Sequence, residues 1–268
     1  MTTRLRVCLA GATGWVGRGL APAIEAAEDL ELVGAVSRSQ AGRTLGDVLD
    51  DPKLTISIRA TVGEALRVPC DVFVDYTSPE AVESHVREAI AAGAHAVIGT
   101  SGVTEEQFAS IDQAARARPV GVLAVGNFAL TAVLLQRFAE IAAKHLPAWE
   151  IIEYGHSRKP DAPSGTARQL ANRLSAIRRP EAPVPVGQTH GLKEARGASF
   201  QGSQIHSVRL PGFVSSMEIL FGLPDERLSI RHDAGSGAGP YIAGTLLAIR
   251  KVGSFSGLKR GLDEVMEI

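Results

Sequence analysis

Short apolar runs alternate with amphipathic stretches along the first half of the chain. The amphipathic stretches have helical periodicity and cover residues 17–28, 81–92 and 105–116. Strands that alternate with helices favour a parallel sheet wound on both sides. We therefore predict an α/β, Rossmann-type dinucleotide-binding domain over residues 1–126. Its strands should be the apolar runs, because a strand that is buried on both faces is apolar at successive positions. These runs cover residues 5–10, 32–36, 72–76, 96–99 and 121–125.

The pattern changes after residue 126. A long helical stretch at 129–145 is followed by a strand at 149–154 and a second helix at 166–178. Strand-like alternation then dominates, at 204–210, 217–221 and 227–232. Residues 127–236 are therefore predicted to form a smaller α+β domain with a mixed or antiparallel sheet. Residues 237–268 are predicted to be helical and to pack back on the first domain.

Composition excludes several classes of protein. The 268 residues carry a formal net charge of −1, which gives no reason to expect nucleic acid or a membrane surface as a partner. The two cysteines form no C-x-x-C pair and the seven histidines show no paired ligand spacing, so we expect neither a disulfide framework nor a metal. The first residues lack a secretory apolar core, and we expect a cytoplasmic protein.

The first apolar run leads into a glycine-rich turn. Gly11, Gly14 and Gly17 form a GxxGxxG pattern between this run and the helical stretch that follows. Glycine permits a tight turn, and it lets backbone N–H groups approach a pyrophosphate at the start of a helix. We expect this turn to bind a dinucleotide through Gly11, Ala12, Thr13, Gly14, Trp15, Val16 and Gly17.

The second strand ends where a residue that contacts the adenosine ribose is expected. An acidic residue there bonds the ribose hydroxyls of NAD, whereas this chain has Ser37 and Arg38. Both suit a 2′-phosphate, to which the Arg38 guanidinium can donate charge-assisted hydrogen bonds. We expect NADPH to be preferred over NADH. The alternative is that Arg38 is a solvated surface charge.

Three further strand ends carry polar, turn-forming residues. In an open α/β sheet, ligands bind beyond the carboxyl ends of the strands. The loops that follow the third, fourth and fifth runs are therefore expected to line the cofactor site, through Thr77, Gly99, Thr100, Ser101, Gly126, Asn127 and Phe128.

Residues 153–166, EYGHSRKPDAPSGT, join a basic cluster to a helix start. Ser164 stands where an N-cap is expected, so backbone N–H groups at the start of the helix are free to bind a carboxylate. His156 and Lys159, a few residues upstream, can add positive charge or a proton. The segment predicts a site for a small dicarboxylate. The alternative is a capped helix beside a solvated basic loop.

The segment KPDAPSGTA closely resembles the substrate motif of the dihydrodipicolinate reductase family. GATGWVG, YTSPE, GTSG and GNF match the same family in the same order, so the resemblance covers essentially the whole chain. It implies a Rossmann-type domain, a smaller substrate-binding and oligomerisation domain, and a homotetramer. It also implies NAD(P)H-dependent reduction of 4-hydroxy-tetrahydrodipicolinate, after loss of water, to tetrahydrodipicolinate in lysine and diaminopimelate biosynthesis.

The resemblance also implies roles for single residues. Gly165 and Thr166 are expected to bind a substrate carboxylate, with Ser164 at the helix start. His156 is expected to contact the substrate, and Lys159 to donate the proton. Lys159 and His156 are therefore the expected catalytic residues.

The chain departs from the family at Gly155, where the first of two adjacent histidines is usual. Trp15-Val16 stands where Arg-Met is usual, GNFALTA differs from the common continuation of NFS, and the residues after Arg231 lack basic side chains often found there. Glycine can neither donate a proton nor hold charge. Protonation is therefore expected to depend on Lys159, alone or with His156 or Tyr154.

Two basic residues further along the chain, His206 and Arg209, could replace lost carboxylate contacts or could be exposed residues on a sheet face.

Three functions stay open at this stage. They are a divergent member of the family, a paralogue that reduces another small imine or unsaturated acid, and a catalytically inactive cofactor-binding regulator. The retained Lys159 and helix start argue against the last, since an inactive site has no need of a carboxylate clamp.

Overall fold

The computed structural model describes residues 4–267, and the chain divides into two compact units. The first unit contains the chain up to Leu130 together with the chain from Ala238 onward, and the second runs from Thr131 to Gly237. Within residues 4–267, no helix is long and apolar enough to cross a membrane.

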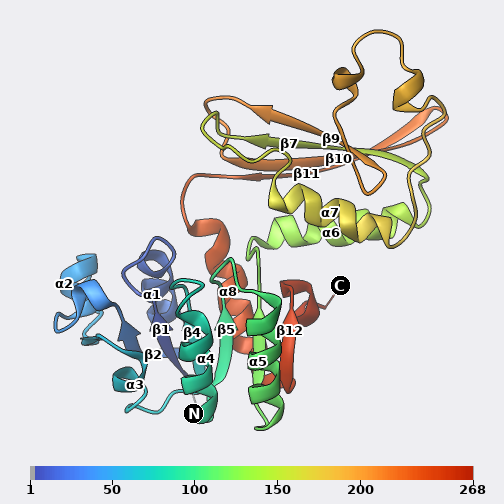
Figure 1. Ribbon diagram of the computed structural model, residues 1–268. Coiled ribbons are helices and arrows are strands. Elements are labelled where there is room, and N and C mark those ends of the chain that lie inside the picture. The colour runs from blue at the N-terminus through green and yellow to red at the C-terminus, as the bar shows by residue number, and fades with distance from the viewer. Residues whose placement is uncertain (1–3, 268) are drawn as a thin grey trace. The chain divides into compact units, whose positions relative to one another are not determined.

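A seven-stranded parallel sheet forms the centre of the first unit, in the order β12-β6-β5-β4-β1-β2-β3 (Figure 1). The strand order reverses between β1 and β4, and ligands of such sheets bind beyond the carboxyl ends of the strands at this switch point. The strands are β1 (Leu5–Ala10), β2 (Leu30–Val36), β3 (Ile58–Arg59), β4 (Val72–Asp75), β5 (His95–Ile98), β6 (Gly121–Ala124) and β12 (Gly257–Arg260).

Helices cover both faces of this sheet (Figure 1). On one face α1 (Gly17–Ala26) packs beside α8 (Gly239–Lys251), and on the other α4 (Val82–Ala91) packs between α3 (Val62–Ala65) and α5 (Glu105–Arg116). A further short helix, α2, spans Leu45–Leu49. The strands are apolar along their whole length because both faces are covered, and their side chains form one continuous core with α4 and α5.

The second unit is built on a five-stranded mixed sheet in the order β11-β10-β7-β9-β8. β7 and β9 are parallel and the other neighbours are antiparallel. Two helices, α6 (Leu130–Ala143) and α7 (Gly165–Ser175), pack on one face of this sheet (Figure 1). The strands are β7 (Ala148–Gly155), β8 (Ala198–Phe200), β9 (Ser203–Arg209), β10 (Ser215–Leu223) and β11 (Glu226–Ala234).

Side chains along β7 alternate between the two faces of the second sheet. Trp149 and Ile151 are buried beneath α6 and α7, whereas Ile152 and Tyr154 lie half-buried on the opposite face. The predicted fold class, a Rossmann-type doubly wound sheet with a smaller α+β domain, is confirmed.

The sequence pattern missed several short elements. The expectation that the last residues are helical is wrong at Gly257–Arg260, which form β12 and pair in parallel with β6 at the edge of the first sheet. Only four residues long and partly exposed, β12 has no periodic pattern of its own, and its pairing is with a distant part of the sequence. The short elements α2, α3, β3 and β8 were also missed, and none of them is longer than five residues.

The contact between β6 and the C-terminal segment leads to a first prediction. A Cβ added to Gly121 would lie 2.1 Å from the carbonyl oxygen of Val252 and 2.7 Å from that of Phe255, so backbone must move. We expect Gly121→Ala to lower the free energy of unfolding in urea by about 1–3 kcal/mol, as overpacking of a core does. Gly239→Ala, where an added Cβ meets no atom within 4 Å, is the control. Equal stability of the two variants would contradict the prediction.

Candidate active site

The glycine-rich turn of the first unit leaves no room for a side chain at Gly11 or Gly17. Gly11 has φ +80°, and a Cβ there would lie 2.3 Å from the carbonyl oxygen of Tyr76. A Cβ on Gly17 would lie 2.2 Å from the carbonyl oxygen of Gly11, so the turn closes on the first residue of α1. Val16 occupies the N-cap of α1 and has no side-chain acceptor to offer. The turn and helix start therefore fit a bound pyrophosphate, which such backbone N–H groups can hold.

The residues after β2 lie next to this turn. The hydroxyls of Thr13 and Ser37 are 2.8 Å apart, which joins the turn to the end of β2. Arg38 is exposed at the start of a short 3₁₀ turn. Arg59, which the sequence reasoning missed, ends β3 and accepts the backbone N–H of Ser37 on its carbonyl oxygen. One arginine thus follows β2 and another is the last residue of the adjacent strand β3, both at the carboxyl ends of the strands.

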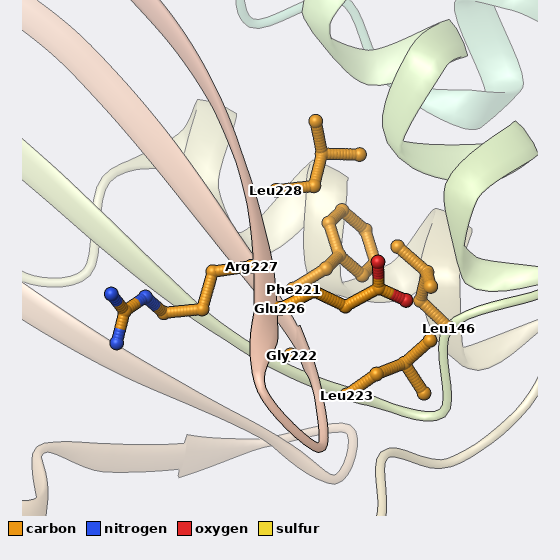
Figure 2. Close-up of a pocket in the computed structure, with 7 residues that line it drawn as sticks. All are labelled: Leu146, Phe221, Gly222, Leu223, Glu226, Arg227 and Leu228. Carbon is orange, nitrogen blue, oxygen red and sulfur yellow. The ribbon is translucent and has the colours of Figure 1, made fainter.

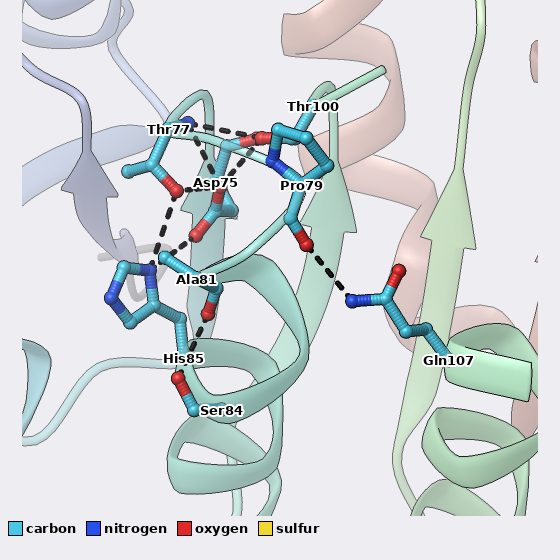
Figure 3. Close-up of polar contacts among 8 residues, drawn as sticks. All are labelled: Asp75, Thr77, Pro79, Ala81, Ser84, His85, Thr100 and Gln107. Carbon is cyan, nitrogen blue, oxygen red and sulfur yellow. Dashed lines mark hydrogen bonds and ion pairs between the residues drawn. The ribbon is translucent and has the colours of Figure 1, made fainter. Parts of the chain in front are cut away.

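A buried carboxylate fixes the loops after β4 and β5 (Figure 3). Asp75 is fully buried and accepts hydrogen bonds from the hydroxyls of Thr77 and Thr100, both at 2.7 Å, and from the Thr77 backbone N–H at 2.9 Å. Nδ1 of His85 lies 2.9 Å from its second oxygen. The network directs both threonine hydroxyls inward, so their protons are not available to a cofactor. The sequence reasoning missed Asp75 and His85. An acidic residue at the end of an apolar strand, as Asp75 is, was the available signal of a buried polar network.

The other predicted cofactor residues differ in their exposure. Trp15 is 59% exposed, and its ring forms a T-shaped pair with the Tyr241 ring, with the two centroids 5.5 Å apart. Phe128 is buried against the ring of Tyr76, so its contact with a cofactor could come only from the backbone. The rest lie at or near the carboxyl edge, with Ala12 buried, Gly14, Ser101 and Gly126 exposed, and Gly99 and Asn127 half-buried.

In the second unit, the predicted substrate residues lie together between β7 and α7. Ser164 is the N-cap of α7 and its Oγ accepts a hydrogen bond from the Ala167 N–H at 3.2 Å. Gly165 and Thr166 begin the helix, where N–H groups have no intrahelical acceptor. Nζ of Lys159 forms an ion pair with Asp161 at 2.6 Å, and His156 is exposed. The positions suit an anion at the helix start with an ammonium nearby.

Glu153 holds this segment in place, and the sequence reasoning missed it. Its Oε1 accepts from the Ser164 N–H at 2.9 Å, from Ser207 Oγ at 2.6 Å and from Arg209 Nη2 at 2.7 Å. Burial raises the pKa of Glu153, but these hydrogen bonds outweigh it and bring the pKa below its ordinary value. The carboxylate therefore contributes stability above its unfolded-state pKa and loses that contribution as pH falls through the lowered pKa. A charged residue at a buried position of β7 was the available signal.

The structure separates Tyr154 and His206 from this cluster. Tyr154 lies on the opposite face of the sheet, with its ring 5.0 Å from that of Phe213, and its hydroxyl donates to Glu218 at 3.3 Å. His206 also lies on that face and pairs with Glu150 at 2.7 Å. The suggestions that Tyr154 assists protonation and that His206 replaces a carboxylate contact are therefore wrong, because alternate residues of a strand face opposite sides. Arg209 faces the cluster.

Two hollows of the second unit lie away from this segment. Figure 2 shows a small one of about 120 Å³, lined by the β10–β11 hairpin and Leu146. A larger one, about 700 Å³, lies between the sheet and the loop around Pro183. Neither is lined by Lys159 or by Ser164–Thr166.

The network at Asp75 leads to a second prediction. Asp75→Asn replaces one acceptor oxygen of this buried side chain with a donor, so we expect unfolding in urea to become easier by about 1–3 kcal/mol. We also expect weaker NADPH binding in a fluorescence titration, because the loops after β4 and β5 lose their common anchor. Thr100→Ser keeps the hydroxyl and should preserve both properties. Wild-type affinity and stability in Asp75→Asn would show that the network anchors nothing.

Comparison with known proteins finds similarity to one family of reductases along almost the whole chain. Family models described as "Dihydrodipicolinate reductase, N-terminus" and "Dihydrodipicolinate reductase, C-terminus" match residues 5–128 and 131–266. A 4-hydroxy-tetrahydrodipicolinate reductase of Desulfitobacterium hafniense is 39% identical over 98% of this chain and 99% of its own length. One of Moorella thermoacetica is 38% identical over 100% of both chains.

A solved structure is also similar. The dipicolinate-bound dihydrodipicolinate reductase from Paenisporosarcina sp. TG-14 is 31% identical, with a TM-score of 0.86, over 98% of this chain and 100% of its own. The relatives are named reductases, which confirms the assignment to a family of NAD(P)H-dependent oxidoreductases. Two family models that together cover almost the whole sequence, and relatives of equal length, place this chain in the dihydrodipicolinate reductase family.

Proposed function

We propose that this protein reduces 4-hydroxy-tetrahydrodipicolinate, through dihydrodipicolinate, to tetrahydrodipicolinate in lysine and diaminopimelate biosynthesis. The observation that carries the proposal is the position of Lys159 beside the start of α7, on a segment anchored by buried Glu153. A small dianionic substrate fits this arrangement of one ammonium and free backbone N–H groups. The names of the full-length relatives support the same substrate.

The residues around the glycine-rich turn fit a pyridine dinucleotide, and we infer that NADPH is preferred over NADH. No acidic side chain follows β2 where one would bond the ribose hydroxyls of NAD, because Ser37 and Arg38 stand there. Arg59, at the end of the neighbouring strand, adds a second guanidinium for a 2′-phosphate. When bound, the cofactor supplies the hydride of the reduction.

The residues of the second unit have separate tasks in this mechanism. The N–H groups of Gly165 and Thr166 bind one substrate carboxylate, with Ser164 keeping the helix start in shape. His156 contacts the substrate from the exposed loop. Lys159 leaves Asp161 and donates the proton that balances the incoming hydride, while its charge stabilises electron density that develops on the substrate ring.

We further infer that the protein forms a homo-oligomer, with the tetramer of the family as the expected state. The sheet face opposite α6 and α7 carries the half-buried apolar residues Ile152, Val208 and Leu220. The adjacent loop exposes Val184 and Leu192, at 62% and 78%. Such a surface suits self-association.

A cytoplasmic location and the absence of nucleic-acid and membrane partners stay expectations from the sequence.

Turnover of substrate freshly made from pyruvate and aspartate semialdehyde tests the proposed function. We expect oxidation of NADPH to depend on this substrate, and Lys159→Met to lower kcat by about 10²–10⁴-fold, the usual value of general acid catalysis. NADPH affinity should not change, since Lys159 belongs to the substrate segment. Arg158→Met, which removes an exposed charge one residue away, is the matched control.

Two outcomes would contradict different parts of the proposal. A protein that binds NADPH and leaves this substrate unchanged favours a paralogue acting on another small imine or unsaturated acid. If the substrate is reduced and Lys159→Met keeps the wild-type kcat, the proton comes from another group.

The cofactor preference has its own test. Arg38→Asp places a carboxylate where a 2′-phosphate is proposed, and we expect the KM for NADPH to rise about tenfold or more, because a charge-assisted hydrogen bond is replaced by repulsion. The KM for NADH should fall or stay constant. Arg67→Asp is the control. It makes the same charge change in the exposed loop before β4, at the amino-terminal ends of the strands. A KM for NADPH that is unaffected by Arg38→Asp would make Arg38 a solvated surface charge.

A further inference from the structure

A pair of side-chain hydroxyls joins the glycine-rich turn to the end of β2. Oγ1 of Thr13 and Oγ of Ser37 are 2.8 Å apart, and both residues are half-buried. Beside them, the carbonyl oxygen of Val36 accepts the backbone N–H of Gly11 at 3.0 Å and that of Ala12 at 3.3 Å. These hydrogen bonds hold the turn and the end of the strand at a fixed spacing.

Three arginines lie next to this hydroxyl pair. Arg38 follows Ser37 directly, and the carbonyl oxygen of Arg59 accepts the backbone N–H of Ser37 at 3.0 Å. Arg18, in the first turn of α1, donates from Nε to the carbonyl oxygen of Thr13 at 3.1 Å. This contact fixes the base of the Arg18 guanidinium beside the turn, and its two Nη groups have no acceptor among residues 4–267.

The three guanidiniums also have no carboxylate partner in the part of the chain that the structure describes. Other arginines of the first unit do have one, such as Arg6 with Asp71 and Arg250 with Asp29. Cations that are gathered without a counter-charge repel one another, and an anion placed among them relieves this repulsion. A phosphate monoester suits the position, because it carries about two negative charges and several acceptor oxygens that guanidiniums bind well.

We propose that the glycine-rich turn takes part in recognising the 2′-phosphate of NADPH, through the Arg18 guanidinium and the Thr13 hydroxyl. This inference rests on the proposed preference for NADPH and extends it to residues of the turn. Arg18 adds a third guanidinium to those of Arg38 and Arg59. Thr13 is a positioning residue, because its hydrogen bond holds Ser37, and with it Arg38, at the spacing that the two phosphate sites of one cofactor require.

These two residues affect NADPH and NADH differently. NADH has a hydroxyl where NADPH has the 2′-phosphate, so it gains little from a further guanidinium at this end of the site. Both cofactors place the same pyrophosphate against the backbone N–H groups at the start of α1. A loss that is confined to the 2′-phosphate therefore weakens NADPH binding alone, whereas a loss at the pyrophosphate weakens the binding of both cofactors.

The first test compares the two cofactors in an Arg18→Met variant. Kd values for NADPH and NADH are measured by calorimetry on the full-length protein without substrate. We expect the Kd for NADPH to rise about tenfold, because a charge-assisted hydrogen bond to the phosphate is lost, and the Kd for NADH to stay within about twofold. Arg67→Met, which removes an exposed charge in the loop before β4, is the matched control and should change neither value.

The second test separates the Thr13 hydroxyl from the shape of its side chain. Thr13→Val removes the hydroxyl and keeps the shape, and we expect it to raise the Kd for NADPH about three- to tenfold with little change for NADH. Thr13→Ser keeps the hydroxyl and should bind NADPH as the wild type does. In an Arg38→Met background the effect of Thr13→Val should be much smaller, because the two changes act on the same phosphate contact.

The outcomes distinguish this inference from the proposals on which it rests. If Arg18→Met and Thr13→Val keep the wild-type ratio of the two Kd values, or weaken NADH binding as much as NADPH binding, the turn does not recognise the 2′-phosphate. A wild-type protein with equal Kd values for both cofactors contradicts the preference for NADPH and this inference together. Failure to reduce the proposed substrate affects neither, since both Kd values are measured without it.

Discussion

The ion pair between Glu153 and Arg209 is the interaction on which the substrate side of this protein depends. Glu153 is almost fully buried, and it gathers hydrogen bonds from the N-cap of α7, from β9 and from the guanidinium. A buried charge is tolerated only when its partners replace the hydration it has lost. That requirement couples the end of β7, the start of α7 and the Lys159 segment into one arrangement. Removing either partner would leave an uncompensated charge beneath the site.

The first unit uses the same physical device at its own site. Asp75 is fully buried at the end of β4, and it also accepts one backbone N–H, hydroxyl groups and a bond involving a basic side chain, His85. In both units a buried carboxylate at or near the carboxyl end of a strand holds neighbouring segments in place by accepting hydrogen bonds from them. Loops positioned in this way bind ligands with less loss of conformational entropy. The two sites are therefore built on strand ends that the buried carboxylates hold in place.

Much of the architecture could be predicted because it depends on local patterns. The uninterrupted apolar runs predicted the buried parallel strands, and the change after residue 126 predicted a second kind of sheet. The glycine spacing could be interpreted because Gly11 and Gly17 lie where any Cβ would collide with backbone. β12 could not be predicted, since four residues without periodicity become a strand only through their pairing with β6. The partners of Asp75 were also hidden, because His85 and Thr100 reach it from separate loops.

The sequence by itself determined the fold class and the family, because buried strands, tight glycine turns and helix caps each need particular residue types at particular spacings. The tertiary structure decided which of those residues act together. Tyr154 and His206 are close in sequence to Gly155 and Arg209 but face the other side of the sheet. The register between β7 and β9 is what brings Arg209 opposite Gly155, and register depends on pairing between distant segments. In the folded protein the side chains of Lys159 and Arg209 border Gly155, a contact that the sequence did not reveal.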